Sequence, residues 1–313
     1  MSRAFVFPGQ GSQAVGMGAE LASAFSAARE VFEAVDEALG QHLSRLMFEG
    51  PEDELTLTEN AQPALMAVSL AVTRVLEREG GINLAGSAGF VAGHSLGEYS
   101  ALAAAGALTI EDAARLLKRR GQAMQEAVPV GQGAMAAVLG LDLEAVAEVA
   151  QDAAQGQVCA PANDNAPGQV VISGDTAAVE RAVEIAAGRG AKRSIMLPVS
   201  APFHCALMAP AADVMATALA EIVMKPPVVP LIANVTAGAT EDRDDIRRLL
   251  VQQVTAMVRW RESVLAMKFA GVETLVELGA GRVLTGLARR IDRDLNAAAV
   301  GNPADVEVFI KAL

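Results

Sequence analysis

Short apolar blocks alternate along the chain with longer stretches of helical periodicity. Residues 4–7 form the first block, which ends at a Pro-Gly pair and so predicts a buried strand followed by a loop. Apolar positions recur at helical spacing over residues 25–39 and again over 64–79, and both stretches end at glycine. A short strand is predicted at 88–92, and helical composition returns at 99–105. This order predicts a sheet covered by helices.

The middle of the chain has a denser alternation. Its pattern predicts strand, helix, strand, strand, helix and strand, at residues 134–139, 143–154, 158–160, 169–173, 176–187 and 193–197. This order is the ferredoxin-like arrangement, which can fold as its own α/β layer. We therefore interpret residues 130–198 as a small domain inserted into a larger, discontinuous domain made of residues 1–129 and 199–313.

The last third of the chain alternates again between helical and strand-like segments. Helical stretches are predicted at 206–224, 244–269 and 284–291, with strands at 228–233 and 273–278. Strands that alternate with helices favour a parallel sheet. The fold class is therefore α/β.

Composition and charge narrow the class of protein. The 313 residues carry 25 Lys and Arg against 37 Asp and Glu, a formal charge of −12, and 52% of them are hydrophobic. This composition excludes wholesale disorder, and the length allows a substantial core. An acidic chain with only 4% aromatic residues is also poorly suited to nucleic acid, which needs basic contacts and stacking platforms.

The few cysteines and histidines and the short apolar stretches indicate where the protein is located and whether it binds a metal. Two cysteines, Cys159 and Cys205, form no CxxC pair, and three histidines leave little for a metal site. The apolar run at the N-terminus is too short for a secretory signal, and no apolar stretch reaches the length of a membrane span. We expect a cytoplasmic protein that uses no metal and does not bind membranes.

A G-x-S-x-G motif lies where the pattern places a strand before it and a helix after it. Gly93 and Gly97 flank Ser95. In a nucleophile elbow such glycines leave room for a sharp turn that presents the serine at the top of a sheet. Short motifs of this kind also arise by chance, so a plain loop serine is the alternative. The strand-turn-helix context favours Ser95 as a nucleophile.

A serine hydroxyl needs a base to accept its proton. His204 follows the inserted segment, at a Pro-containing loop between a strand and a helix, and it fits the required chain order. The alternative is a capping or core histidine. We expect His94 to be structural, since neighbours of Ser95 on a tight turn point away from it, and His42 to be solvated. Cys205 is interpreted as a small apolar neighbour of His204.

The loop around Gln10 follows the first predicted strand. It lacks the Lys-Ser/Thr ending of a P-loop, which argues against nucleotide binding. In serine acyl transfer, two backbone N–H groups hold the negative oxygen of the tetrahedral intermediate. The residue after the nucleophile and a second strand-end loop supply them, so we predict that Leu96 and Gln10 form this oxyanion hole.

Taken together, several motifs resemble one family over essentially the whole chain. They are FPGQGSQ at residues 7–13, GHSLGEYSAL at 93–102, RGQAMQ at 120–125, N-x-N-x-P-G-Q at 163–169, FHC at 203–205 and G-x-G-x-V-L at 279–284. The chain resembles the malonyl-CoA:acyl carrier protein transacylases. The resemblance implies an acyltransferase of type II fatty acid biosynthesis, with an α/β-hydrolase-like large domain and a ferredoxin-like small domain.

The resemblance also assigns roles to residues. It implies that Ser95 is acylated and that His204 is the general base and later the general acid. It further implies that Arg120 pairs with the free carboxylate of the malonyl group, to which a planar guanidinium is suited. The histidine would be supported by a backbone carbonyl at the position of Gln253, in place of a third acid.

Substrate preference and partners follow from the same resemblance. Related domains with Phe before the histidine and an aliphatic residue after the serine take malonyl units, and this chain has Phe203 and Leu96 there. The expected partners are malonyl-CoA and acyl carrier protein, with coenzyme A thioester as substrate and no cofactor. We expect a monomer.

Arg120 has a different interpretation if the resemblance is ignored. It stands in Lys118-Arg119-Arg120, and three adjacent cations on a helix are usually solvated. The charge of −12 raises a related difficulty, because carrier proteins of this pathway are expected to be acidic. Docking would then need a local basic patch, for which the pairs 192–193 and 289–290 are candidates.

Three other functions share parts of this pattern. A serine hydrolase or thioesterase would use the same serine and histidine but would admit water and need no arginine. A non-catalytic subunit that binds the carrier protein would need neither the serine nor the histidine. An acyltransferase that acts in trans for a polyketide assembly line is separated only poorly from the fatty-acid enzyme by sequence.

Overall fold

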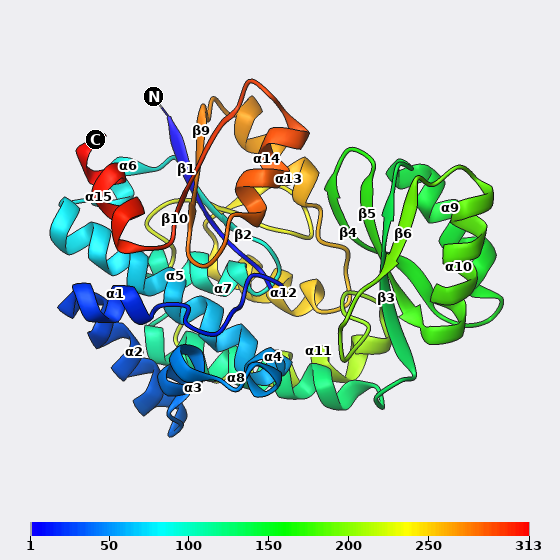
Figure 1. Ribbon diagram of the computed structural model, residues 1–313, viewed down its shortest axis with the longest axis horizontal. Helices are drawn as coiled ribbons and strands as arrows, with labels where there is room; N and C mark the ends of the chain where they lie inside the picture. The colour runs from blue at the N-terminus through cyan, green and yellow to red at the C-terminus, as the bar shows by residue number, and fades with distance from the viewer. Residues whose placement is uncertain (1, 313) are drawn as a thin grey trace.

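Two separate sheets organise the α/β architecture (Figure 1). The computed structural model describes residues 2–312. The first sheet has six strands in the order β10-β9-β1-β2-β7-β8, and its neighbours are parallel except at the β7–β8 edge. Its strands are β1 (Arg3–Phe7), β2 (Phe90–Gly93), β7 (Leu231–Ile232), β8 (Ala239–Thr240), β9 (Thr274–Leu278) and β10 (Asn296–Val300).

Helices cover both faces of this sheet. They are α1 (Ala19–Ala24), α2 (Ser26–Leu39), α3 (Leu43–Glu49), α4 (Glu52–Thr56), α5 (Thr58–Gly80), α6 (Leu84–Ser87), α7 (Gly97–Ala104), α8 (Ile110–Ala127), the 3₁₀ turn η1 (Ala206–Met208), α11 (Ala209–Ala220), α12 (Arg243–Gln253), α13 (Trp260–Phe269), α14 (Val283–Ile291) and α15 (Pro303–Lys311). Alternate residues of β1 serve the two faces, as the pleat requires. Phe5 and Phe7 join the core that includes α2, α5 and α8, whereas Ala4 and Val6 pack with Trp260 on the other face.

The second sheet lies to one side of the first, in the green part of Figure 1. Its strands β3 (Gly133–Leu139), β4 (Cys159–Ala166), β5 (Gln169–Asp175) and β6 (Arg193–Met196) are antiparallel in the order β4-β5-β3-β6. Helices α9 (Leu143–Ala154) and α10 (Thr176–Gly188) pack on one face of it through a separate apolar cluster. The structure is thus a mixed α/β fold with one largely parallel and one antiparallel sheet.

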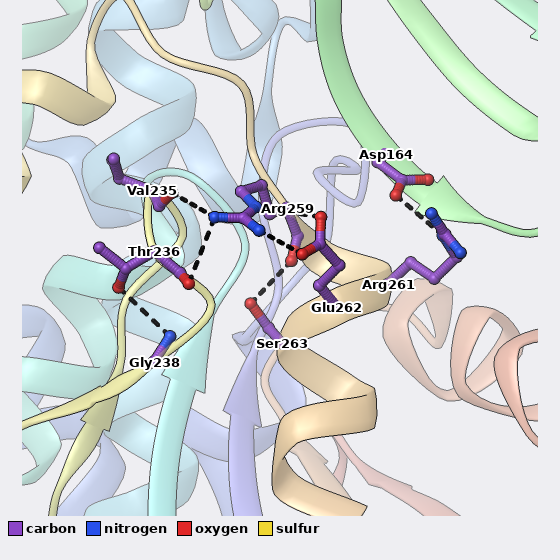
Figure 2. Close-up of polar contacts among 8 residues, drawn as sticks. All are labelled: Asp164, Val235, Thr236, Gly238, Arg259, Arg261, Glu262 and Ser263. Atoms are coloured by element: carbon purple, nitrogen blue, oxygen red, sulfur yellow. Dashed lines mark hydrogen bonds and ion pairs between the residues drawn. The ribbon is translucent and has the colours of Figure 1, made fainter. Parts of the chain in front are cut away.

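A non-helical segment at 254–259 joins the two parts, and it corrects one prediction. The helix predicted over 244–269 is interrupted at 254–259, where a turn is followed by a bridge between Val258 and Asn163 of β4. Val258 accepts a hydrogen bond from the N–H of Asp164 and donates its own N–H to Ala162, both at 2.9 Å. Figure 2 shows the ion pair beside it, between Arg261 Nε and Asp164 Oδ2 at 2.8 Å. Pairing with β4 requires extended backbone, and this tertiary contact overrides the local helical pattern.

Other segment boundaries also differ from the prediction. The strand predicted at 228–233 is reduced to β7, because Pro230 directly before it has no N–H to donate to a ladder. The helix predicted at 206–224 divides into η1 and the shorter α11. Strand β4 is longer than predicted, and β8, β10 and α15 are elements that the pattern did not indicate.

Candidate active site

Ser95 lies on a sharp turn between β2 and α7. Its φ of 53° is in the left-handed region, where residues other than glycine are strained. A Cβ at Gly93 would lie 1.9 Å from the backbone carbon of Gly97, and one at Gly97 would lie 2.3 Å from the carbonyl oxygen of Phe7. Both positions therefore exclude any side chain. The Ser95 N–H donates to Asn234 Oδ1 at 2.8 Å, which holds the turn from outside.

His204 reaches Ser95 from a loop 109 residues further along the chain. Its Nε2 lies 2.8 Å from Ser95 Oγ, and its Nδ1 lies 2.8 Å from the backbone carbonyl oxygen of Gln253. A carbonyl can only accept, so Nδ1 carries the proton and Nε2 is left to accept one from the serine. His204 also has a positive φ of 59°. This is the geometry of a nucleophile with its base, oriented by a carbonyl.

The environment of His204 keeps its imidazole neutral. Burial lowers the pKa of His204 to about 3, and the nearby cation of Arg120 lowers it further, while the hydrogen bond to Gln253 opposes both effects. At any pH well above this pKa, the imidazole is neutral and can accept a proton. The base is therefore in its accepting form in the free protein.

Arg120 lies inside the protein and points at the same serine. It is 1% exposed, and its Nη2 donates to Ser95 Oγ at 3.1 Å and to Gln253 Oε1 at 2.9 Å. Its Nη1 donates to Gln62 Oε1 at 2.7 Å. The guanidinium lies 5.8 Å from the centre of the Tyr99 ring. None of these partners is a carboxylate, so the site holds a buried cation whose hydrogen-bond partners carry no charge.

The interpretation of Arg120 as a solvated helix charge is therefore wrong. Arg120 follows Leu116 and Leu117 at helical spacing and precedes Met124 by one turn, and all four are buried. It thus belongs to the apolar face of α8. Its neighbour Arg119 is on the outer face, where it pairs with the exposed Glu221. The spacing along α8 was the signal that could have separated the two arginines.

A cavity of about 440 Å³ opens onto these groups. Gln10, Ser95, Leu96, Arg120 and His204 all line it. Side chains from both parts of the molecule complete its wall, among them Met135 of β3, Asn163 of β4 and Phe203. No hydrogen bond within residues 2–312 uses the backbone N–H of Gln10 or of Leu96. Both donors are thus available to a bound oxygen, although the roles given to these residues remain predictions.

Two buried polar residues were missed by the sequence analysis. Glu98, in the first turn of α7, is 1% exposed and accepts from the N–H of Asn234 at 2.6 Å and from Gln253 Nε2. Asn234 also donates from Nδ2 to the carbonyl of Gly93 at 2.7 Å. A lone acid directly after the motif, in an otherwise apolar helix, was a usable signal for Glu98. Asn234 had none, because its role depends on residues far away in the chain.

The remaining candidates lie at the edge of the site or outside it. His94 Nε2 lies 2.8 Å from Asn165 Oδ1, its ring packs beside Trp260, and burial lowers its pKa. Cys205 is buried, and its Sγ donates to the carbonyl of Pro202. His42 is exposed at the start of α3. In the part of the chain that the structure describes, no cluster of three or more metal-ligating side chains occurs, and none of the described helices could span a bilayer.

Known proteins are similar to this chain over nearly its whole length. Residues 4–300 match the acyl transferase domain family. The malonyl CoA-acyl carrier protein transacylase of Escherichia coli K12 is 50% identical over 301 residues, which are 96% of each chain. The solved acyl-carrier-protein-S-malonyltransferase of Bartonella henselae is 56% identical with a TM-score of 0.97, over 100% of this chain and 99% of that one. A malonyl-transacylase solved in complex with its type II PKS acyl-carrier protein is 46% identical over 100% of both chains, also with a TM-score of 0.97.

These similarities extend over nearly the full length of the chain and of its relatives. They cover both sheets and every residue of the site described above. The chain belongs to the acyl transferase domain family and, within it, to the malonyl CoA-acyl carrier protein transacylases.

Proposed function

We propose that this acyltransferase moves the malonyl group from malonyl-CoA to the phosphopantetheine thiol of acyl carrier protein through an ester on Ser95. The observation that carries the proposal is the buried guanidinium of Arg120, 3.1 Å from the nucleophilic oxygen and in the same cavity. A buried cation with uncharged partners is suited to an acyl group that ends in a carboxylate. An acyl group without that charge gains nothing from it.

In the first half-reaction, Ser95 Oγ attacks the thioester carbon while His204 Nε2 takes the hydroxyl proton. The carbonyl oxygen becomes negative and is held by the N–H groups of Gln10 and Leu96. When the tetrahedral intermediate collapses, the C–S bond breaks and the coenzyme A sulfur receives the proton from His204. Arg120 holds the malonyl carboxylate throughout, which keeps the acyl group in one orientation.

The second half-reaction reverses these steps with a different thiol. His204 takes the proton of the phosphopantetheine thiol, whose sulfur attacks the ester carbonyl. The bond to Ser95 Oγ then breaks, and the serine oxygen takes the proton back. Every proton moves through His204, so the proposal needs no metal or cofactor. Ping-pong kinetics should follow.

Finer features of the protein belong to the same proposal. The strand order β4-β5-β3-β6 and the β-α-β-β-α-β sequence support a ferredoxin-like domain at residues 130–198. The strand-turn-helix around Ser95 supports an α/β-hydrolase-like domain for the rest of the chain. We place the enzyme in type II fatty acid biosynthesis. A monomeric state and a cytoplasmic location remain predictions from the sequence.

Replacing the arginine tests the proposal directly. Arg120→Ala should lower kcat/KM for malonyl-CoA by about 100-fold, since a buried charged partner is lost, while acetyl-CoA becomes relatively better. Arg119→Ala removes the adjacent, outward-facing arginine and is the matched control. Transfer from each thioester to carrier protein is the measurement. Unchanged malonyl transfer in Arg120→Ala would remove the carboxylate clamp from the proposal.

Mass spectrometry separates transfer from hydrolysis. After incubation with malonyl-CoA alone, a transferase should hold a stable malonyl ester on Ser95, and Ser95→Ala should hold none. Rapid release of free malonate would favour a hydrolase. Comparing carrier proteins of fatty-acid and polyketide systems as acceptors then distinguishes the fatty-acid enzyme from one that acts in trans for polyketide assembly.

A further inference from the structure

The buried carboxyl of Glu98 has no part in the proton transfers described above. It lies one turn behind the nucleophile, and it is almost fully removed from water. Burying such a group is costly unless hydrogen bonds compensate for the lost water. Both of its oxygens are engaged, Oε1 by the backbone N–H of Asn234 and Oε2 by the side-chain amide of Gln253. A buried acid retained at this cost suggests a specific task.

The Gln253 side chain connects this acid to the arginine. Its Nε2 donates to Glu98 Oε2 and, at 3.0 Å, to the carbonyl oxygen of Ser95. Its Oε1 accepts from Arg120 Nη2 at 2.9 Å. The orientation of the amide matters, because a flipped amide would point two N–H donors at a guanidinium that can only donate. Glu98 favours the orientation that turns Oε1 toward Arg120.

We propose that Glu98 is a positioning residue for malonyl selectivity: its carboxyl orients the Gln253 amide, and the amide aims the Arg120 guanidinium at the substrate carboxylate. This inference rests on the proposed malonyl transfer and adds a residue to it. The backbone carbonyl of Gln253, which holds His204, belongs to the end of α12 and does not depend on the orientation of the side-chain amide. Glu98 should therefore act on the choice of acyl group more than on the chemistry at Ser95.

The protonation state of Glu98 matters for this role. Burial raises the pKa of Glu98 to about 8, while its hydrogen bonds from Asn234 and Gln253 and the charge of Arg120 favour the ionised form. The role belongs to the ionised carboxylate, in which both oxygens accept, because a proton on Oε2 would make Glu98 a donor toward Gln253. Gln62 binds the other terminal nitrogen of Arg120, so the guanidinium is held between two amide oxygens, of which only the one on Gln253 depends on an acid.

Glu98→Gln is the most informative substitution. The backbone N–H of Asn234 cannot rotate away, so the new side chain should keep its oxygen there and present its NH₂ to Gln253. The movable Gln253 amide should then flip to offer Oε1 to that NH₂, which takes the oxygen away from Arg120. We expect the ratio of kcat/KM for malonyl-CoA over acetyl-CoA to fall by about tenfold, the loss of one charge-assisted hydrogen bond. The larger part of the change should be in KM for malonyl-CoA.

Two comparisons show whether the effect passes through the arginine. In an Arg120→Ala background, Glu98→Gln should not change the ratio further. Glu111→Gln, the same substitution at an exposed position in the first turn of α8, should leave the ratio as it is in the wild type. The inference is overturned if Glu98→Gln keeps the wild-type ratio, or if it lowers the ratio equally with and without Arg120.

A second variant covers the case in which Glu98→Gln does not fold. Gln253→Met removes the amide but keeps the backbone carbonyl, and it should lower the same ratio. A wild-type ratio in Gln253→Met would contradict the inference. The outcome is also separate from that of the proposed function. If the wild-type enzyme does not transfer malonyl, the function fails, whereas a malonyl-selective wild type with an equally selective Glu98→Gln variant contradicts only the role of Glu98.

Discussion

At the scale of single residues, the arginine that we propose binds the malonyl carboxylate also affects the pKa of the histidine beside Ser95. Arg120 and His204 both contact Ser95 Oγ, one by donating to it and the other by accepting its proton. Burial is the main cause of the low pKa of His204, and the cation of Arg120 is the next. A malonyl carboxylate on Arg120 would offset that cation. Binding of the correct substrate should thus make His204 more basic as it takes the proton.

This coupling predicts the pH dependence of acylation. kcat/KM requires neutral His204 in the free enzyme, so it falls as the pH drops through the pKa of His204. With that pKa near 3, acylation by acetyl-CoA should show no acid limb between pH 8 and about pH 5. Arg120→Ala removes a cation, raises the pKa and should move the limb to higher pH. Arg119→Ala should not, and a wild-type limb near pH 6.5 would contradict the prediction.

At the scale of elements, residues 254–259 connect the two sheets to His204. This non-helical segment begins after Gln253, whose carbonyl orients His204, and it pairs with β4 through Val258. Arg259 extends the connection by donating to the carbonyls of Val235 and Thr236, as Figure 2 shows. The position of β4, and with it Asn163 in the cavity wall, is thereby linked to the position of the base.

The ion pair between Asp164 and Arg261 should contribute to this connection. The side chain of Asp164 is 1% exposed, so Asp164→Ala leaves buried space and an unpaired arginine beside it. We expect the free energy of unfolding to fall by about 1–3 kcal/mol. Glu49→Ala breaks the exposed pair with Arg45 and should change it by less than about 0.5 kcal/mol. Urea denaturation of both variants is the measurement. Equal effects would show that the ion pair at β4 stabilises the fold no more than an exposed ion pair does.

At the scale of the whole molecule, the charge of −12 is a constraint on docking. An acidic carrier protein would be repelled at long range, so a local basic surface must receive it. Lys192 and Arg193 are exposed at the start of the edge strand β6, and neither forms an ion pair within residues 2–312. Arg290 is less available to a partner, since its side chain donates a hydrogen bond to Gln169. The first pair is therefore the stronger candidate for the docking surface.

Charge reversal tests that surface. Lys192→Glu combined with Arg193→Glu should raise KM for carrier protein about fivefold or more, because two attractive charges become repulsive. Acylation by malonyl-CoA alone should be unchanged, since the pair lies outside the cavity lining. Reversal of Arg289 and Arg290 is the comparison. A larger effect at that second pair would place the docking surface there instead.

Much of the fold was predictable because its signals are local. The helix ending at Leu39 is closed by Gly40 in the left-handed conformation, and α9 has the predicted bounds, Leu143–Ala154. The interruption at 254–259 was not predictable, because Val258 leaves the helical conformation only where β4 is present to pair with it. In the same way, Pro230 was visible in the sequence. Whether it shortens β7 depends on which strand lies beside it, and the sequence does not show that.

For the site, the sequence alone determined the turn at Ser95, since a Cβ at Gly93 would collide with Gly97, four residues along the chain in the same motif. Only the tertiary structure decided that Arg120 is buried, that the carbonyl of Gln253 holds His204, and that Glu98 lies behind both. The physical reason is distance along the chain. Residues 120 and 253 meet only after the sheet has formed. The burial of Arg120, which strengthens its effect on the pKa values of its neighbours, likewise exists only in the assembled fold.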